Sequence, residues 1–556
     1  MRSKALSDIA DREFDVIVIG AGINGAGIAR EAARRNLRVL LLDKGDIAGG
    51  TSAWSTRLIH GGLRYLEHGE LKLVRESLRE RERLLSAAPH LVRPLPMLVP
   101  VYAGGRRSLS AIRAGMLAYD LLSFDKSLGR HRMLSRAETL RRAPGLSAKG
   151  LRGAALYFDA QVEYAERLVL ENVLSAREWG ASVLTYARVE RGLVEGGAMR
   201  GVAFVDLIDG GRRPQHQAFA SVVLNVAGPW VDEVVAQVPC PAAARLVGGT
   251  KGSHLVVANF PGAPREALYA EAATDRRPFF IIPWNKLYLV GTTDTRYAGD
   301  LDQVMANEDE IEYLLRETNH LIPASGLTRD SVLYTYSGVR PLAFQADGAA
   351  GGITRRHFLH DHAPALEGFV SVVGGKLTTY RSLAEQAIDL VCKKLRRRVL
   401  TIDSTAFDNL PGAPPRGSDM AEFGAHFAAD SPLPAATNAR LLRVYGVRAA
   451  EVLDVCREHS RLCEPLVAGG EAVAAEVIFS FRHEIAETLT DCLLRRTMLS
   501  LNSACGLDVV EPAACVAQEF LGWDQQRADR EINKYRRHVR RFHPRAFSAQ
   551  NNPDPA

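Results

Sequence analysis

Hydrophobic and polar positions alternate in blocks over the first fifty residues, and these blocks predict a strand, a helix and a second strand. Residues 16–19 read VIVI, an apolar run of β-branched residues that is typical of a strand buried in a parallel sheet. A helical segment follows, and residues 38–42 form a second apolar run that ends at Asp43. This order of elements predicts a βαβ unit with parallel strands.

The turn between this strand and the helix has the glycine spacing G-x-G-x-x-G. Gly20 allows a tight turn, Gly22 lets the backbone approach a pyrophosphate, and Gly25 lets the helix pack on the strand. The helix N-terminus offers its dipole and its free N–H groups to the phosphates. Asp43 follows about 20 residues later, where a carboxylate binds an adenosine ribose. The unit therefore predicts dinucleotide binding, and the fingerprint by itself leaves both FAD and NAD open.

Beyond this unit the pattern predicts peripheral helices, a strand-rich centre and a helical end. Residues 70–88 are typical of a helix with a polar face, and residues 106–124 carry apolar side chains at helical spacing beside three arginines. Strand-like stretches alternate over residues 151–300. The segment PGAPPRGS at 411–418 indicates a linker, and the chain after it is predicted to be helical.

Composition bounds these predictions without changing them. A chain of 556 residues with 47% hydrophobic and 24% charged residues is typical of a soluble protein with more than one domain. No apolar run approaches the roughly 18 residues of a membrane span, and we expect no secretory signal. The seven cysteines are scattered without a C-x-x-C pair, which favours reduced thiols in the cytosol. The net charge of +6 permits an anionic substrate or an acidic membrane surface.

A zinc site is not expected. His483 and Glu484 begin the sequence HEIAE, but a zinc protease motif needs a second histidine where Glu487 stands. We therefore expect no metal.

Seven further segments combine glycines, hydroxyl groups and cations. They are GGTSAWSTRLIHGGLRYLEHGE at 49–70, NVAGPW at 225–230, GTKGSHLVV at 249–257, GTTD at 291–294, YTYSGVRPL at 334–342, ITR at 353–355 and GGKLTTYR at 374–381. Together with the glycine fingerprint they closely resemble the FAD-dependent glycerol-3-phosphate dehydrogenase family of the D-amino-acid-oxidase-like superfamily. The resemblance runs over about residues 14–400 and continues more weakly in the helical C-terminal part.

The resemblance implies a multidomain fold that combines the α/β and α+β classes. We expect a Rossmann-like FAD-binding domain of the glutathione-reductase type, a substrate-binding cap on an antiparallel sheet, and an all-helical domain. The expected ranges are 1–70, 150–240 and 335–400 for the FAD-binding domain, 71–149 and 241–334 for the cap, and 405–556 for the helical domain.

The resemblance also implies FAD as the cofactor and assigns its contacts. The glycine turn and Asp43 would hold the ADP half, and the loop that starts at residue 49 would bond the pyrophosphate and ribityl groups. The segment that starts at residue 374 would present backbone N–H groups to the flavin pyrimidine edge. The expected cofactor residues are Gly20, Gly22, Asn24, Gly25, Asp43, Ser52, Ser55, Thr56, His60, Gly61, Gly62, Gly228, Gly374, Gly375, Leu377 and Thr378.

The implied reaction is the oxidation of sn-glycerol 3-phosphate at C2 to dihydroxyacetone phosphate. Hydride would pass from C2 to flavin N5, and the electrons would pass to ubiquinone. Arg64, Arg340, Arg355 and Lys376 match the family's cationic substrate positions, and guanidinium groups grip a phosphate through paired hydrogen bonds. Tyr65 would donate one more hydrogen bond to the substrate.

Loss of the hydride requires a group that accepts the proton of the C2 hydroxyl, and a neutral histidine is the usual one. His254 is the favoured base because its position matches the family's substrate-contacting histidine. His60 is the other candidate and is assigned mainly to the flavin loop. Arg340 could stabilise the developing alkoxide, so we count it with His254 as catalytic.

A quinone acceptor is dissolved in lipid, so we expect a cytoplasmic protein bound to the inner face of the cytoplasmic membrane. The helix at 106–124 or the basic helix at 527–543 would contact anionic lipid. In the second helix an apolar stripe runs from Ile532 to Phe542, and the alternative is that this stripe packs on its own domain. We further expect a homodimer and no nucleic-acid partner.

Four other functions stay open at this point. A glycerol-3-phosphate oxidase would use the same site and reduce oxygen to peroxide. An amine or amino-acid oxidase would need fewer cations, and a catalytically silent flavoprotein should have lost some of them. An NAD-dependent dehydrogenase would leave residues 49–65 and 374–381 unexplained.

Overall fold

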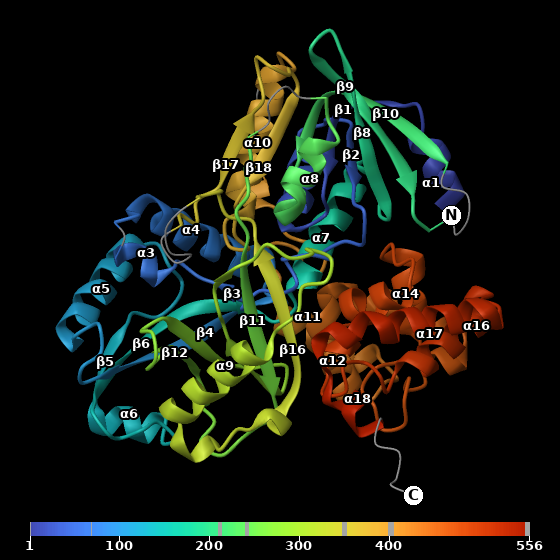
Figure 1. The fold of residues 1–556 in the computed structure, drawn as a ribbon. Helices are drawn as coiled ribbons and strands as arrows, with labels where there is room; N and C mark the ends of the chain where they lie inside the picture. The colour runs from blue at the N-terminus through green and yellow to red at the C-terminus, as the bar shows by residue number, and fades with distance from the viewer. Residues whose placement is uncertain are drawn as a thin grey trace, which may run out of the picture.

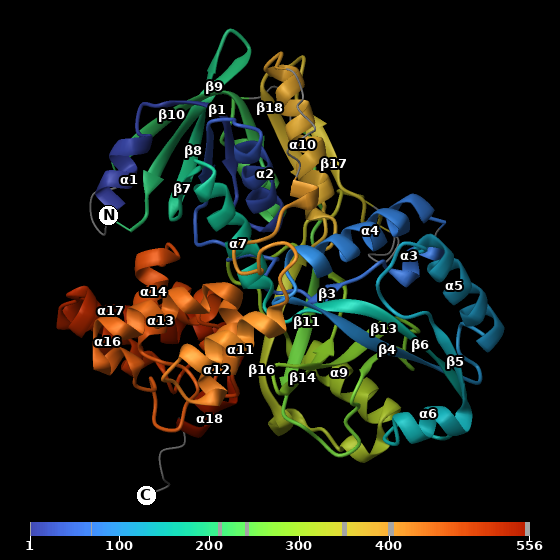
Figure 2. The same cartoon turned by 180° about the vertical axis from the view of Figure 1, so that it is seen from behind.

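Two β-sheets and a group of helices make up the molecule (Figure 1). The computed structural model describes residues 2–67, 69–208, 214–239, 244–346, 353–397 and 405–550, without the side chains of Arg64 and of residues 548–550. In Figure 1 the eight-stranded sheet lies at the top, the ten-stranded sheet lies below it, and the C-terminal helices lie beside the lower sheet. Figure 2 shows the same arrangement from behind.

The first sheet has a parallel centre. β1 (Glu13–Ile19) pairs in parallel with β10 (Gln215–Asn225) on one side and β2 (Val39–Leu42) on the other. The other strands are β7 (Ser182–Leu184) and β18 (Phe369–Val373), which extend the parallel order, and the antiparallel β8 (Ala187–Glu195), β9 (Ala198–Asp206) and β17 (Phe358–Asp361). Because the central strands are parallel, their carboxyl ends meet at one edge of the sheet.

Both faces of this sheet are covered, which explains its continuous apolar runs. The helices on one face are α2 (Ile23–Arg34), α7 (Ala165–Glu178) and α10 (Tyr380–Lys394). On the other face, α1 (Arg2–Ile9) and α8 (Val231–Ala236) each contribute side chains to a second cluster of buried apolar residues.

The second sheet has the order β15-β11-β14-β13-β12-β4-β6-β3, with β16 beside β11 and β5 beside β6. All of these pairings are antiparallel except that of β12 with β4. The strands are β3 (Leu58–Ile59), β4 (Val92–Tyr102), β5 (Arg132–Ser135), β6 (Leu151–Val162), β11 (Thr250–Val257), β12 (Ala267–Glu271), β13 (Pro278–Trp284), β14 (Leu287–Gly291), β15 (Thr295–Arg296) and β16 (Val332–Arg340). The helices α3 (Leu63–Glu67), α4 (Leu71–Ala87), α5 (Leu109–Leu122), α6 (Arg136–Arg142) and α9 (Glu308–Leu321) flank it (Figure 1).

Sheet membership differs from the expected domain ranges at three strands. β3 and β6 lie within ranges expected for the FAD-binding domain, and β16 begins in the cap range and continues into the FAD-binding range, yet all three pair in the second sheet. β6 pairs with β4 from Val92↔Val162 to Tyr102↔Leu151, and β16 pairs with β11 along nearly its whole length. These long ladders of hydrogen bonds hold the strands in the second sheet. The chain therefore crosses between the two sheets at β3, β6 and β16.

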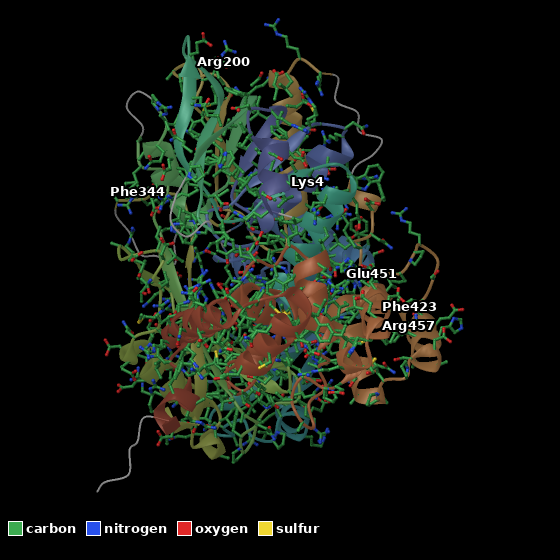
Figure 3. The ribbon with its side chains drawn as sticks, turned by 90° about the vertical axis from the view of Figure 1, so that its right-hand side faces the viewer. Lys4, Arg200, Phe344, Phe423, Glu451 and Arg457 are labelled. Atoms are coloured by element: carbon green, nitrogen blue, oxygen red, sulfur yellow. The ribbon has the colours of Figure 1, made fainter. Side chains whose placement is uncertain are left out.

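The C-terminal part is helical, as expected. Residues 405–550 contain no strand, and one isolated bridge joins Pro465 to Val473. The longer helices are α11 (Met420–Asp430), α12 (Ala435–Tyr445), α13 (Ala449–Glu458), α14 (Ala475–His483), α16 (Val510–Leu521) and α17 (Gln525–Val539), and α18 (Arg545–Gln550) follows them. Figure 3 shows this side of the molecule, with Glu451 and Arg457 at the outer rim of the helical group.

Buried ion pairs join the helical domain to the first sheet and its helices. Asp46, in the loop after β2, accepts from Arg496 Nη2 at 2.7 Å and from Arg495 Nε at 2.6 Å. Arg167 of α7 donates to Glu484 at 2.6 Å. Removing one partner of a buried pair leaves an uncompensated charge and typically costs about 3–5 kcal/mol. These pairs therefore hold the helical domain in one position.

The two helices considered for lipid contact differ in what covers them. In the basic helix, Tyr535, Val539 and Phe542 are buried, and Tyr535 donates to the carbonyl of Cys505 at 2.7 Å. The prediction that this stripe faces lipid is wrong, because protein covers it: Tyr535 packs within the helical domain, and Phe542 packs against Trp54 of the loop at 49–56. On α5, Leu121 is 75% exposed, and neighbouring apolar side chains are exposed as well. Among the described residues, no helix is long and apolar enough to cross a membrane.

Candidate active site

A cavity of about 840 Å³ lies where the two sheets meet. Its walls include the carboxyl ends of β1 and β2, the loop at 49–56, and residues of β11 and β16. Open α/β sheets bind their ligands beyond the carboxyl ends of the strands. Of the expected site residues, those that line it are Gly20, Gly22, Asn24, Asp43, Ser52, Ser55, Thr56, His60, Gly62, Tyr65, Gly228, His254, Arg340, Arg355, Gly374, Gly375, Lys376, Leu377 and Thr378.

The glycine turn is shaped by close backbone contacts. Gly20 has φ +111°, and a Cβ there would lie 2.6 Å from the carbonyl oxygen of Val226. A Cβ at Gly25 would lie 1.7 Å from the carbonyl oxygen of Gly20. Gly22 is the N-cap residue of α2 and faces the cavity, whereas Gly25 is buried behind the turn. The turn thus brings the helix N-terminus to the cavity wall.

Asp43 provides a carboxylate at the end of β2. Its Oδ2 accepts from the Ala21 N–H at 2.6 Å, and its Oδ1 accepts from the Gly45 N–H at 2.7 Å. Burial raises the pKa of Asp43, and the two N–H groups oppose that shift. A carboxylate oxygen can accept more than one hydrogen bond, so both oxygens can also accept from ligand hydroxyls.

Side chains beside the turn offer further polar contacts. Ser52 Oγ accepts from the Ile23 N–H at 2.9 Å at the start of α2. Asn24 Nδ2 donates to the carbonyl of Gly374 at 3.1 Å, while Asn24 Oδ1 is buried and has no hydrogen-bond partner among the described residues. A Cβ at Gly375 would lie 2.4 Å from Asn24 Nδ2. An acceptor oxygen without a partner, in a cradle where a Cβ does not fit, suits a dinucleotide such as FAD.

The loop at 56–62 connects the two parts of the cavity. The His60 N–H donates to Thr378 Oγ1 at 3.1 Å, and burial lowers the pKa of His60 to about 4. The Gly61 N–H donates to the Tyr119 hydroxyl at 2.9 Å, and a Cβ there would lie 2.4 Å from that oxygen. Gly61 therefore supports the loop from behind and does not line the cavity. Gly62 has φ +78° and lines it.

His254 lines the cavity from the middle of β11 in the second sheet. Its Nε2 lies 3.0 Å from Thr56 Oγ1, and its ring stacks on Tyr336 with the centroids 4.9 Å apart. A Cβ at Gly291 would lie 2.2 Å from His254 Cδ2, so this glycine makes room for the imidazole. Burial, followed by the positive charge of Arg340, lowers the pKa of His254 well below its ordinary value. The imidazole is thus neutral at physiological pH, and its Nδ1 has no hydrogen-bond partner in the part of the chain that the structure describes.

Three arginines surround one carboxylate in the lining of the same cavity. Asp294 accepts from Arg340 Nη1 at 3.1 Å and from Arg355 Nη2 at 3.1 Å, and Arg277 Nη2 lies 3.0 Å from it. Burial disfavours the charged form, but the guanidinium groups hold the pKa of Asp294 below its usual range. One carboxylate against three guanidinium groups leaves two net positive charges. Burial also lowers the pKa of Arg340 to about 10, so it remains charged at neutral pH.

Sequence reasoning missed Arg277 and Asp294. Asp294 ends the segment GTTD, and the sequence pattern assigns no role to its carboxylate. Arg277 lies one residue before β13 and carries no sequence signal that separates it from a surface arginine. Only the meeting of β13, β16 and the loops beside them shows that these residues belong together.

Lys376 forms a second cationic position. Its Nζ lies 3.7 Å from the ring centroid of Tyr65 and has no hydrogen-bond partner among the described residues. Burial lowers the pKa of Lys376 to about 7, although Glu70 and Glu76 favour its charged form. The expected contact of Arg64 lies outside the described residues, because its side chain is not described. Among the described residues, no group of His, Cys, Asp and Glu side chains is arranged to hold a metal ion.

Comparisons with known proteins agree with this geometry. Residues 15–381 match the family of FAD-dependent oxidoreductases, and residues 383–528 match the C-terminal domain of alpha-glycerophosphate oxidase. The chain is 45% identical to a glycerol-3-phosphate dehydrogenase of Synechocystis sp., over 96% of this chain and 97% of that protein. It is 35% identical to a glycerol-3-phosphate dehydrogenase of Mycobacterium leprae, over 97% of this chain and 90% of that protein.

Solved structures show the same fold. The glycerol-3-phosphate dehydrogenase from Bacillus halodurans, complexed with FAD, has a TM-score of 0.79 at 27% identity and covers 97% of both chains. L-alpha-glycerophosphate oxidase from Mycoplasma pneumoniae, with FAD bound, shares the fold with a TM-score of 0.55 at 16% identity, over 72% of this chain and 99% of that one. The chain therefore belongs to the glycerol-3-phosphate dehydrogenase family of FAD-dependent oxidoreductases.

Proposed function

We propose that this protein oxidises sn-glycerol 3-phosphate to dihydroxyacetone phosphate and passes the electrons through FAD to ubiquinone. The observation that carries the proposal is the group of Arg277, Arg340 and Arg355 around the single carboxylate of Asp294. It places two net positive charges on the cavity wall, and a phosphate monoester carries about 1.5–2 negative charges at neutral pH. The names and folds of the relatives support the same substrate.

The residues between this wall and the glycine turn would carry out the proton transfer. Bound FAD supplies the acceptor for the hydride that leaves C2. His254 is neutral and would take the proton of the C2 hydroxyl, while the electron pair of the O–H bond becomes part of the new carbonyl. Arg340 would stabilise the negative charge that develops on the oxygen. Lys376 and Tyr65 would contact the substrate from the other side, together with Arg64.

The expected alternatives differ in what they require of this wall. A single carboxylate, as in an amino-acid substrate, carries one charge, which is less than the arginine group offers. A silent flavoprotein would not need to retain Arg340, Arg355 and Lys376, all of which line the cavity. An oxidase would use the same residues, so the electron acceptor has to be measured.

The test is an anaerobic reduction of the purified flavoprotein. Glycerol 3-phosphate should bleach the visible flavin absorbance, whereas glycerol, which lacks the phosphate, should not. Reoxidation by a soluble ubiquinone analogue that outpaces reoxidation by oxygen would support the quinone acceptor, and rapid peroxide formation would support the oxidase instead. A bound flavin that glycerol 3-phosphate does not bleach would exclude the proposed substrate.

We further propose that α5 and the start of α4 contact the inner face of the cytoplasmic membrane. Leu117, Leu121 and Phe124 are 57%, 75% and 77% exposed. Arg75 of α4 lies 4.6 Å from the ring centroid of Phe124, and Arg113 of α5 is exposed. An apolar row beside cations is typical of a surface that binds anionic lipid. A large exposed apolar row also marks a surface that interacts with a membrane or with another protein.

Sedimentation with vesicles tests the membrane contact. Leu121→Asp should reduce binding to vesicles that contain anionic lipid, and high salt should reduce it further. Phe407→Asp is the matched control, because Phe407 is 71% exposed but lies outside α4 and α5. Equal binding of both variants would exclude α5 as the contact. The expected homodimer stays a prediction. Sedimentation of the holoenzyme without vesicles would test it.

A further inference from the structure

One residue of the cavity wall comes from the far end of the chain. Arg541 lines the same cavity as the glycine turn, and it belongs to the turn Arg540–Phe542 that follows α17. The match to the C-terminal domain of alpha-glycerophosphate oxidase ends at residue 528, so this turn lies beyond it. Neither the family fingerprint nor the proposed reaction assigns a role to this segment.

Packing fixes this turn against the loop at 49–56. The ring of Phe542 lies 4.9 Å from the ring of Trp54, between centroids, and Phe542 is buried. Thr335 of β16 donates its hydroxyl to the carbonyl of Phe542 at 3.2 Å. The loop that contains Trp54 also contains Ser52, which reaches the N-terminus of α2. Arg541 is therefore held next to the residues that surround the dinucleotide cradle.

Arg541 has no carboxylate partner among the described residues. Its Nη1 is 3.5 Å from the backbone carbonyl of Asp302, its Nη2 donates to His538 Nε2 at 3.0 Å, and its guanidinium carbon lies 5.6 Å from the centroid of the Trp54 ring. Its Nε is buried and has no hydrogen-bond partner within the described ranges. Burial and the nearby positive charge of Arg495 lower the pKa of Arg541 to about 10, although Asp302 favours the charged form, so Arg541 is still charged at neutral pH.

His538 is suited to hold this cation in place. Burial, followed by the charge of Arg541, lowers the pKa of His538 well below its ordinary value. The imidazole is therefore neutral and accepts from the guanidinium group. Together these contacts orient Arg541 without neutralising it.

We propose that Arg541 binds the diphosphate of FAD, and that the C-terminal turn closes the cofactor site. A half-buried cation that forms no ion pair among the described residues and faces the cavity of a FAD-dependent protein can find its counter-charge in the cofactor. Guanidinium groups bind diphosphates through paired, charge-assisted hydrogen bonds. The arginine group around Asp294 is a separate set of residues on β13, β16 and the loops beside them. The inference rests on FAD as the cofactor and is independent of the substrate.

The test measures FAD binding by the full chain after the flavin has been removed. Arg541→Gln should weaken FAD binding about tenfold to hundredfold. The quenching of flavin fluorescence measures the binding. Arg541→Lys should restore part of the loss, because it returns the charge without the paired donors. Arg537→Gln is the control, because Arg537 is an exposed arginine of α17, the helix that precedes this turn. It should leave FAD binding unchanged.

Two further readouts separate cofactor binding from a structural role. ADP should compete with FAD less well in Arg541→Gln than in the parent protein, whereas adenosine, which lacks phosphates, should compete equally well in both. The melting temperature of the apoprotein should not fall in Arg541→Gln, while that of the holoprotein should. An equal loss in both forms, or an unchanged affinity for ADP, would overturn the proposal. So would unchanged FAD binding with a raised KM for glycerol 3-phosphate.

Discussion

The two walls of the cavity are built in different ways. The cofactor wall is made largely of backbone: Gly20, Gly22 and Gly25 bring a helix N-terminus to the cavity, and Asp43 is held by two backbone N–H groups. The substrate wall is made of charged side chains from separate strands and loops, with Arg340 and its neighbours around Asp294. The first wall therefore depends on the shape of the backbone, and the second wall depends on charge. Substitutions in the two walls should therefore impair the enzyme in different ways.

The largest effect is expected where the backbone is crowded. In Gly25→Val the new side chain would begin 1.7 Å from the carbonyl oxygen of Gly20, so the turn cannot keep its shape. We expect a destabilisation above about 4 kcal/mol and a protein that is purified without flavin. Gly115→Ala, on α5, is the control because a Cβ there meets nothing within 4 Å. Absorbance spectra and thermal melts of both variants measure the outcome, and a yellow, stable Gly25→Val would contradict it.

The next effect concerns the residue between the two walls. His254→Ala should lower the anaerobic rate of flavin reduction about 10²–10⁴-fold if the imidazole accepts the hydroxyl proton. The variant should retain FAD, because His254 belongs to the second sheet and its side chain contacts Thr56 and Tyr336. His360→Ala is a control on β17 in the first sheet. Stopped-flow reduction gives the rate, and an unchanged rate would remove His254 from this role.

A smaller effect should follow from loss of one charge on the substrate wall. Arg355→Ala removes a guanidinium group whose Nη1 is buried and has no hydrogen-bond partner among the residues that the structure describes. We expect KM for glycerol 3-phosphate to rise about tenfold to hundredfold. The kcat should change little, because a phosphate contact helps the ground state and the transition state alike. Arg356→Ala provides the control, since Arg356 is exposed one residue away. A fall in kcat without a change in KM would place Arg355 at the reacting carbon instead.

The difference between the walls also explains what the sequence can predict. The glycine turn, β1, α2 and β2 follow from residues that are neighbours in the chain, so the pattern predicts them closely. Arg340 and Arg355 could be assigned only through resemblance, and Arg277 could not be assigned at all. A chain with 70 lysines and arginines gives no sign of which of them will be buried together.

Long-range packing accounts for the other differences. The strand at Leu151–Val162 is evident as a strand, but its pairing with β4 rather than with the first sheet depends on register with a distant segment. The apolar stripe that ends at Phe542 indicates that one face is covered, and it leaves open whether lipid or protein covers it. The structure shows protein, with Trp54 against Phe542.

The smallest and most specific effect is expected from pH. Burial lowers the pKa of Lys376 to about 7, so in the free enzyme this side chain loses its charge as pH rises through neutrality. If the charged form contacts the substrate phosphate, kcat/KM should fall on the alkaline side with an apparent pKa near that value. The phosphate itself ionises near pH ~6 and would set the acid side of the profile. Lys376→Arg should remove the alkaline fall, because a guanidinium group stays charged.

The sign of the accompanying stability change follows from the same shift. The unfolded chain binds a proton at Lys376 up to its ordinary pKa of 10.5, whereas the folded chain has lost it above about 7. The contribution of this group to the free energy of unfolding should therefore rise with pH over that interval. Bound substrate should oppose the trend, since the phosphate favours the charged lysine.

A kcat/KM profile that is flat above neutrality in the parent protein, or equally steep in Lys376→Arg, would show that the charge of Lys376 is not used. The charge-based description of the substrate wall would then rest on the arginines around Asp294 alone.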